Sequence, residues 1–174
     1  MNFYKIIELE KNKDFLNNVE KFLFKMIRKE YGYGYIPKFH RDIKNLDKTY
    51  LAHERNNFFL AKDYNDNIIG TIAIREYDKD FPEFKEVYCK KSTASIWRLF
   101  VDEKYRRCGI ASKLVRKVEN FSKERGYKKL YLHTHKNING ALDFWLSLDY
   151  NIRIDTNNSL KTVHMDKIMF NSLE

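Results

Sequence analysis

Apolar side chains recur with helical spacing in two long segments, residues 14–30 and 109–125. The recurring residues are Phe15, Val19, Phe22 and Met26 in the first segment and Ile110, Leu114, Val118 and Phe121 in the second. Because residues three or four apart share one face of an α-helix, each segment is predicted to be an amphipathic helix. Gly126 stands where a left-handed cap commonly ends such a helix. Shorter helices are predicted at about residues 41–50 and at 139–148, the latter capped by Asn139.

Seven shorter stretches combine branched and aromatic residues and are predicted to be strands. They cover residues 3–9, 58–62, 68–75, 92–101, 130–134, 150–155 and 161–169. Residues 64–67 and 156–159 are rich in Asn with Asp or Ser, so each is expected to form the turn of a hairpin. The order is therefore β-α-α-β-β-β-α-β-α-β-β, which predicts an α/β fold with the 109–125 helix as its central crossover.

The composition favours one globular domain over residues 1–174. Hydrophobic residues make up 43% of the chain, which is enough for a core without disulfides or a structural metal. The chain has two cysteines, Cys89 and Cys108, so a disulfide framework is not expected. No window approaches the roughly 20 apolar residues of a membrane span, and charge interrupts the first apolar run too early for a secretory leader. We therefore expect a cytoplasmic protein without a membrane partner.

The net charge is strongly positive, with 33 Lys and Arg against 24 Asp and Glu, or +9 at pH 7. Such a balance favours anionic partners, among them nucleic acids, phosphate-bearing cofactors and acidic surfaces. The basic residues are spread along the chain with acidic residues between them, so many of them are expected to form an ordinary solvated surface. The charge indicates the sign of a partner and leaves its identity open.

A basic loop between a predicted strand and a predicted helix carries the most specific chemistry. Helix N-termini present unpaired amide groups, and the aligned peptide dipoles favour an anion there. Gly109 has no Cβ and Ala111 has only a methyl group, so a diphosphate can approach the backbone closely. Arg106 and Arg107 add positive charge at the same point. The segment therefore suits a pyrophosphate held by backbone amides.

The pattern Arg106-x-x-Gly109-x-Ala111 resembles the acetyl-CoA-binding signature of the GNAT superfamily of N-acetyltransferases. Residues 141–150, which read ALDFWLSLDY, look like the second block of that family, Ala-x-x-x-Tyr-x-x-x-Gly-Phe. The resemblance extends over about residues 3–169. It implies a single-domain, mixed and mostly antiparallel central sheet of about seven strands, flanked by about four helices.

The resemblance also implies an activity and a set of site residues. An amine of a small molecule or peptide would attack the thioester of acetyl-CoA directly, without a covalent acyl-enzyme and without a metal. Strand backbone would pair with the pantetheine arm, helix amides would bind the pyrophosphate, and two aromatic residues would line the thiol end. A strand amide near Val101 would stabilise the oxyanion. The implied cofactor-binding residues are Leu99, Phe100, Val101, Arg106, Arg107, Cys108, Gly109, Ile110, Ala111, Ser112, Phe144 and Trp145.

The acid and the base of such a reaction are less well indicated. Trp145 stands where the family often has the Tyr that protonates the departing thiolate, and Asp149 replaces the usual Gly, so the general acid is unassigned. An alkyl ammonium with a reference pKa of about 10.4 must lose its proton at a cost of roughly 4–5 kcal/mol at pH 7, so a base is expected. His133 is the candidate base, and an ordinary structural or surface histidine is the alternative. His133 and His135 share a strand face but have no further ligands for a metal site.

Several features leave alternatives open. Cys108 lies at a helix N-terminus, a setting that favours a nucleophilic thiolate, although its position beneath the diphosphate argues against that role. Tyr31, Tyr33 and Tyr35 could border an acceptor pocket, stack on bases or form a packed loop. A non-catalytic acyl-CoA-sensing module would fit Trp145, and a nucleic-acid-binding protein would fit the net charge. Nucleic acid is not the expected partner, and a homodimer is left open.

Overall fold

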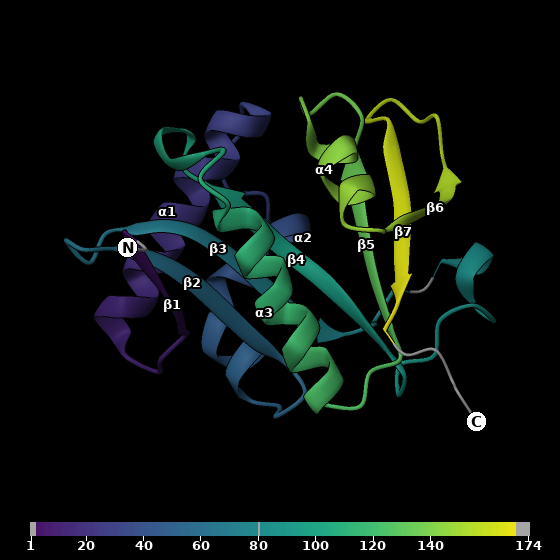
Figure 1. Cartoon of the computed structure of the whole chain (residues 1–174), viewed down its shortest axis with the longest axis horizontal. Helices are drawn as coiled ribbons and strands as arrows, with labels where there is room; N and C mark the ends of the chain where they lie inside the picture. The colour runs from purple at the N-terminus through teal and green to yellow at the C-terminus, as the bar shows by residue number, and fades with distance from the viewer. Residues whose placement is uncertain (1–2, 80, 170–174) are drawn as a thin grey trace. The chain divides into compact units, whose positions relative to one another are not determined.

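The computed structural model describes residues 3–79 and 81–169 and contains one sheet of seven strands (Figure 1). The strand order is β1-β2-β3-β4-β5-β7-β6. The chain divides into two compact units. Of the described residues, the first unit takes those up to Arg75 together with Trp97–Val118, and the second takes Glu76–Ile96 and those from Glu119 onward.

The order of helices and strands confirms the predicted mixed α/β fold. The strands are β1 (Tyr4–Glu8), β2 (Asn57–Asp63), β3 (Ile68–Glu76), β4 (Thr93–Val101), β5 (Lys129–His135), β6 (Asn151–Asp155) and β7 (Thr162–Ile168). The α-helices are α1 (Lys13–Tyr31), α2 (Pro37–His40), α3 (Ile110–Glu124) and α4 (Ala141–Ser147). Shorter helical turns are η1 (Ile43–Asn45), η2 (Asp47–Leu51), η3 (Pro82–Phe84) and η4 (Glu103–Tyr105).

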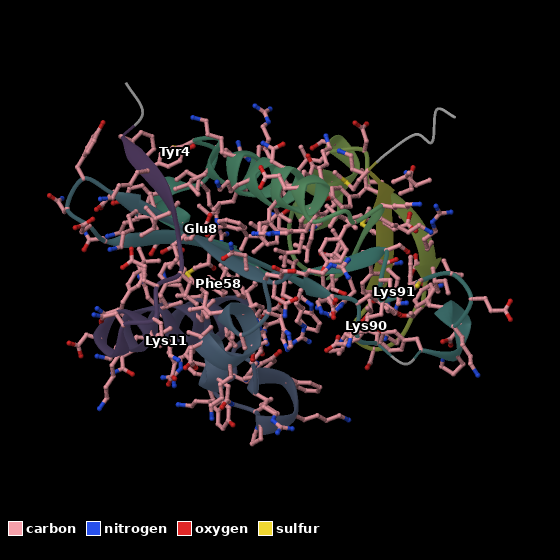
Figure 2. The ribbon with its side chains drawn as sticks, turned by 90° about the horizontal axis from the view of Figure 1, so that it is seen from below. Tyr4, Glu8, Lys11, Phe58, Lys90 and Lys91 are labelled. Carbon is pink, nitrogen blue, oxygen red and sulfur yellow. The ribbon has the colours of Figure 1, made fainter. Side chains whose placement is uncertain are left out.

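In the first unit, α1 and α3 cover opposite faces of the sheet. Phe58 and Leu60 of β2 are fully buried in the cluster that contains the apolar face of α1. Phe59 between them faces the other way, since Lys117 of α3 lies 5.5 Å from its ring centroid. This alternation is the two-residue period of a strand that is covered on both faces. Phe58 is thus interior, whereas Lys11 just before α1 is exposed (Figure 2).

The prediction of one continuous helix over residues 41–50 is wrong. The chain instead makes the short helix α2, which begins at Pro37, followed by the separate turns η1 and η2. The hydroxyl of Tyr50 donates to Asp42 at 2.7 Å, whereas a regular helix would separate these residues by about 12 Å along its axis. A side-chain contact therefore competes here with continuous helical geometry.

Sheet pairing requires one crossover. β1, β2 and β3 pair antiparallel, as do β5, β7 and β6. β4 and β5 pair in parallel over Thr93–Ser95 and Lys129–Tyr131. A parallel pair needs a long connection, and α3 supplies it as predicted.

The ends of the last two helices differ in how well the sequence predicted them. Gly126 has φ 74° and ends α3 in the left-handed region, which confirms the prediction. The predicted cap of α4 by Asn139 is wrong, because Gly140 at φ 73° is the capping residue and no side chain caps this helix. A left-handed residue at that point takes the position that an extended, side-chain-capping residue would need.

Candidate functional site

The loop between β4 and α3 turns sharply just before the helix. Arg107 and Gly109 both have positive φ, 63° and 75°. The first helical bond beyond the loop runs from the amide of Lys113 to the carbonyl of Gly109, at 3.1 Å. The amides of residues 109–112 precede that bond and belong to the turn in which helical N–H groups lack intrahelical acceptors. The predicted pyrophosphate segment is therefore a helix N-terminus whose leading residues, 107–109, are exposed.

Two glycines shape this N-terminus in different ways. A Cβ on Gly109 would meet nothing within 4 Å, so the space above the loop is open and only its positive φ favours glycine. A Cβ on Gly70 of β3 would lie 3.2 Å from Ile110, Leu114 and the carbonyl of Phe100. The first turn of α3 therefore rests directly on β3.

The side chain of Arg106 is directed toward α1. Its Nη2 pairs with the carboxylate of Glu30, and its Nε donates to the carbonyl of Val101 at 3.2 Å. Arg107 is exposed. The two arginines that the sequence places together thus have different surroundings, and the positive charge of Arg106 is shared with a glutamate.

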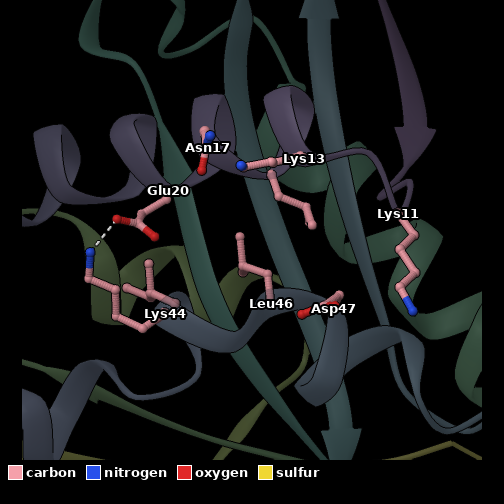
Figure 3. A pocket seen from close by; sticks show the side chains of 9 residues that line it. Lys11, Lys13, Asn17, Glu20, Lys44, Leu46 and Asp47 are labelled. Carbon is pink, nitrogen blue, oxygen red and sulfur yellow. Dashed lines mark hydrogen bonds and ion pairs between the residues drawn. The ribbon is translucent and has the colours of Figure 1, made fainter.

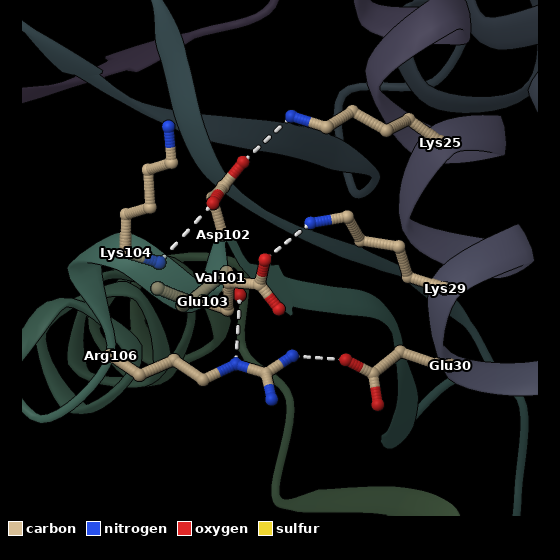
Figure 4. A network of polar contacts seen from close by, with 8 residues as sticks. All are labelled: Lys25, Lys29, Glu30, Val101, Asp102, Glu103, Lys104 and Arg106. Carbon is tan, nitrogen blue, oxygen red and sulfur yellow. Dashed lines mark hydrogen bonds and ion pairs between the residues drawn. The ribbon is translucent and has the colours of Figure 1, made fainter.

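Two carboxylates lie next to the loop and each has a lysine partner. Asp102 accepts from Lys25 at 2.8 Å, and Glu103 accepts from Lys29 at 2.7 Å (Figure 4). These hydrogen bonds lower the pKa of both carboxyl groups, so both are ionised at neutral pH. Asp102 also accepts from the amide of Lys104 at 3.3 Å and thereby caps η4.

Cys108 is exposed, and its thiol lies 3.6 Å from the carbonyl of Arg106. Cys89 is also a free cysteine. The position of Cys108 within the turn agrees with a small side chain in a tight loop. The other candidates in this segment, Ile110, Ala111 and Ser112, form the first turn of α3, with Ile110 buried.

Leu99, Phe100 and Val101 form the end of β4 and are half-buried. They lie beyond Ser95, the last residue of β4 in the parallel pairing with β5. Arg98, just before them, has φ 54°, which interrupts regular strand geometry. The predicted pantetheine-binding segment therefore follows a local irregularity of the strand.

Arg98 and Asp42 form a largely buried ion pair that the sequence pattern did not predict. The Nε and Nη2 of Arg98 donate to the two carboxylate oxygens of Asp42 at 2.9 and 2.6 Å, and Nη2 also donates to the carbonyl of Phe39. The pair ties the α2–η1 segment to β4. The residues lie 56 positions apart, so no local spacing could have revealed the contact.

The aromatic loop after α1 packs around a buried histidine. The rings of Tyr31 and Tyr33 stack with centroids 5.5 Å apart, and Tyr33 and Tyr35 lie 6.0 and 6.2 Å from the ring of His40. His40 accepts from the amide of Ile36 at 2.8 Å. Burial lowers the pKa of His40 and raises that of Tyr31 to about 12. Tyr33 and Tyr35 stay exposed, so this loop is packed at its base and open at its edge.

In the second unit, the predicted aromatic residues lie on α4. Trp145 is 6% exposed, and its ring lies 5.0 Å from Tyr150 and 5.2 Å from Phe144. Phe144 is half-buried. Trp145 thus has the surroundings of a core residue.

The candidate base His133 lies on β5 directly opposite His164 of β7. His133 is half-buried, and its ring lies 6.2 Å from that of His164. His164 is buried and hydrogen-bonds to the hydroxyl of Tyr131 at 2.7 Å, a pair that the sequence reasoning did not identify. Burial lowers the pKa of His164 and of His135. A catalytic role for His133 stays a prediction.

A groove of about 420 Å³ lies between α1 and the η1–η2 segment (Figure 3). Its lining is mixed in character: Lys11, Lys13, Leu16, Asn17, Glu20, Ile43, Lys44, Leu46 and Asp47. Lys44 pairs with Glu20 across it. None of the predicted site residues lines this groove.

Within residues 3–79 and 81–169, no group of three or more His, Cys, Asp or Glu side chains is placed to hold a metal ion. In the same part of the chain, no helix combines the length and the apolar character needed to cross a membrane.

A family model described as the acetyltransferase (GNAT) family matches residues 21–150. The chain belongs to the GNAT acetyltransferase family. N-acetyltransferase 8 of Homo sapiens is 31% identical over 93 residues, which cover 53% of this chain and 37% of that protein. N-acetyltransferase 8 of Mus musculus is 29% identical over 118 residues, which cover 67% of this chain and 48% of that protein. The matches thus take in less than half of either of these relatives.

Solved structures of GNAT proteins share the fold. An acetyltransferase of the GNAT family from Staphylococcus aureus Mu50 has a TM-score of 0.76 at 21% identity, with 96% of this chain and 99% of that chain covered. An aminoglycoside 6'-N-acetyltransferase complexed with coenzyme A has a TM-score of 0.69 at 15% identity, with 98% and 99% covered. At these identities the similarity establishes the fold, which confirms the predicted architecture.

Proposed function

We propose that this GNAT protein transfers an acetyl group from acetyl-CoA directly to a primary amine of a small molecule or peptide. The observation that carries the proposal is the exposed N-terminus of α3, where Gly109 has φ 75° and open space above it. Backbone amides there suit a diphosphate, because they offer donors and a favourable dipole together. The family match over residues 21–150 supports the same assignment.

In this proposal, residues 107–112 bind the pyrophosphate through backbone amides, and Leu99, Phe100 and Val101 offer strand backbone to the pantetheine arm. Catalysis comes chiefly from holding the amine and the thioester together. Phe144 and Trp145 as thiol-end residues, His133 as base, the cytoplasmic location and a homodimer stay predictions. The general acid is unassigned, since the indole of Trp145 does not donate a proton as a phenol does.

Two glycine variants test the cofactor site. Acetyl-CoA should raise the melting temperature of the wild-type protein, because a ligand that binds only the folded state stabilises it. Gly109→Glu should abolish this rise, since a carboxylate at the loop repels the diphosphate and occupies its space. Gly126→Glu is the matched control: Gly126 also has positive φ and open space around its Cβ, but it lies at the other end of α3. An equal loss of the rise in both variants would contradict the proposed location.

The reaction itself is tested by thiol release from acetyl-CoA with a panel of amines. Release with at least one primary amine supports acetyl transfer. Cofactor binding without release for any amine would favour the sensing module instead. If the protein does not bind the cofactor but binds nucleic acid with a strong dependence on salt, it is a nucleic-acid-binding protein instead.

A further inference from the structure

Three ion pairs join one side of α1 to the loop that precedes α3 (Figure 4). The pairs are Lys25–Asp102, Lys29–Glu103 and Glu30–Arg106. We propose that α1 braces the cofactor loop through these pairs, and that Arg106 is a positioning residue rather than a ligand of the diphosphate. This inference rests on the proposed function, because it assigns a role in cofactor binding to residues outside the binding loop.

The two sides of the brace match in order and in charge. Lys25 and Lys29 lie one helical turn apart on α1, and Glu30 follows directly. Along the loop, two carboxylates are followed by an arginine. Positive, positive and negative side chains on the helix therefore meet negative, negative and positive side chains on the loop, over sequence separations of 74 to 77 residues.

Two nitrogens of the Arg106 guanidinium have partners on different elements. Nη2 pairs with Glu30, while Nε donates to the carbonyl of Val101, the last residue of β4. The side chain thereby links the end of the strand, the loop and the helix. The side chain of Glu30 is 20% exposed and that of Arg106 is 49% exposed, so only the carboxylate side of the pair is shielded from water.

The lysines have an electrostatic effect as well as a mechanical one. Asp102 and Glu103 are ionised and lie a few residues before the segment 107–112 that is proposed to receive a diphosphate. Unbalanced, they would repel the anion, and Lys25 and Lys29 cancel that charge locally. Asp102 is 10% exposed, so the loss of Lys25 leaves a poorly hydrated carboxylate beside the site.

A change at Glu30 gives opposite results for a brace and for a direct ligand. If Arg106 held the diphosphate itself, Glu30→Gln would free its guanidinium and remove a nearby negative charge, so coenzyme A would bind more tightly. If Arg106 is a brace, the same variant loosens the loop and coenzyme A binds more weakly. The direction of the change in Kd therefore decides between the two roles.

The experiment is calorimetric titration of coenzyme A into the wild-type chain and its variants. We expect the Kd to rise about threefold for Glu30→Gln and about fivefold for Lys25→Met. Lys25→Arg should restore most of the affinity, which a general loss of packing would not allow. In an Arg106→Gln background, Glu30→Gln should not raise the Kd further, since the Glu30–Arg106 pair is already absent there. Glu20→Gln is the matched control, because this α1 glutamate pairs with Lys44 away from the loop, and its Kd should stay unchanged.

Several outcomes would overturn the inference. A lower Kd for Glu30→Gln would make Arg106 a ligand of the diphosphate, and an unchanged Kd would show that the Glu30–Arg106 pair has no part in cofactor binding. An equal loss of affinity in Glu20→Gln would reduce the effect to general destabilisation. Lys29→Met, at a more exposed pair, gives a second folded variant in case Lys25→Met does not fold. Failure of the wild-type chain to bind coenzyme A would overturn the proposed function itself, a result distinct from the others.

Discussion

At the residue scale, the most constrained charges are those of Arg98 and Asp42. Burial alone would raise the pKa of Asp42, but the hydrogen bonds from Arg98 and Tyr50 hold it below its usual value. Burial would also lower the pKa of Arg98, and Asp42 raises it instead. Each residue therefore favours the charged form of its partner. A buried ion pair of this kind contributes little net stability, but it is costly to break from one side.

Removal of one partner should consequently destabilise the folded protein. We expect Asp42→Asn to lower the free energy of unfolding by about 3 kcal/mol, because it leaves the guanidinium of Arg98 buried without a counter-charge. Urea denaturation measures this loss. Asp155→Asn is the control, since it breaks the more exposed pair with Lys136 and should cost at most about 1 kcal/mol. Equal costs for the two variants would show that the Arg98 pair is hydrated in solution.

At the element scale, the cofactor loop is positioned by the packing of α3 on β3. Gly70 allows the first turn of the helix to approach the strand, with Ile110 and Leu114 at 3.2 Å from a hypothetical Cβ. The two long helices were predictable, because their apolar faces repeat within each segment. The α2–η2 region was not, because Asp42 contacts Arg98 from outside the segment and Tyr50 at a spacing that does not follow the helical repeat.

Gly70→Ala should therefore displace α3 locally. The added methyl lies closer to Ile110, Leu114 and the carbonyl of Phe100 than ordinary contact allows, so we expect a loss of about 1–3 kcal/mol in unfolding free energy. We also expect weaker binding of coenzyme A, because the displaced turn carries the proposed diphosphate amides. Gly34→Ala is the control, since its Cβ would lie 3.7 Å from Arg28 and should be tolerated. A Gly70→Ala protein as stable as the wild type would mean that the side chains of α3 simply move aside.

At the scale of the whole molecule, acid stability depends on buried histidines in both units. Burial is the first cause of the lowered pKa of His40, where Arg98 adds to the effect and Asp42 opposes it. Burial likewise lowers the pKa of His164, where Lys79 and His135 add to it and Glu83 opposes it. The unfolded chain therefore binds protons more readily at these positions than the folded chain does.

Stability should fall as the pH is lowered from 7.5 to 5. The histidine contribution is complete above the ordinary value of 6.5 and is lost as the pH falls through the lower folded values. The carboxyl groups Asp42 and Asp102, whose pKa values are lowered, affect the free energy of unfolding only below a pH of about 3.8. Urea unfolding at pH 7.5, 6 and 5 measures how the free energy of unfolding changes with pH.

The double variant His40→Asn/His164→Asn should flatten this dependence of stability on pH, because the Asn amide offers both a donor and an acceptor in place of Nδ1 but does not titrate. His53→Asn at an exposed position is the control and should keep the wild-type slope. A slope unchanged by the double variant would assign the pH dependence to other groups.

The sequence by itself determined the seven strands, the two long helices, their order and the loop that leads into α3, because these depend on spacing and backbone preference within short segments. It also identified the family, through residues 106–111. Only the tertiary structure decided what Arg106 touches, that Asp42 faces Arg98, and that Trp145 packs on Tyr150. The physical reason is the range of the interactions: a periodic pattern reports neighbours a few residues apart, whereas the Arg106 contact with Glu30 spans 76 residues and exists only after the chain has folded.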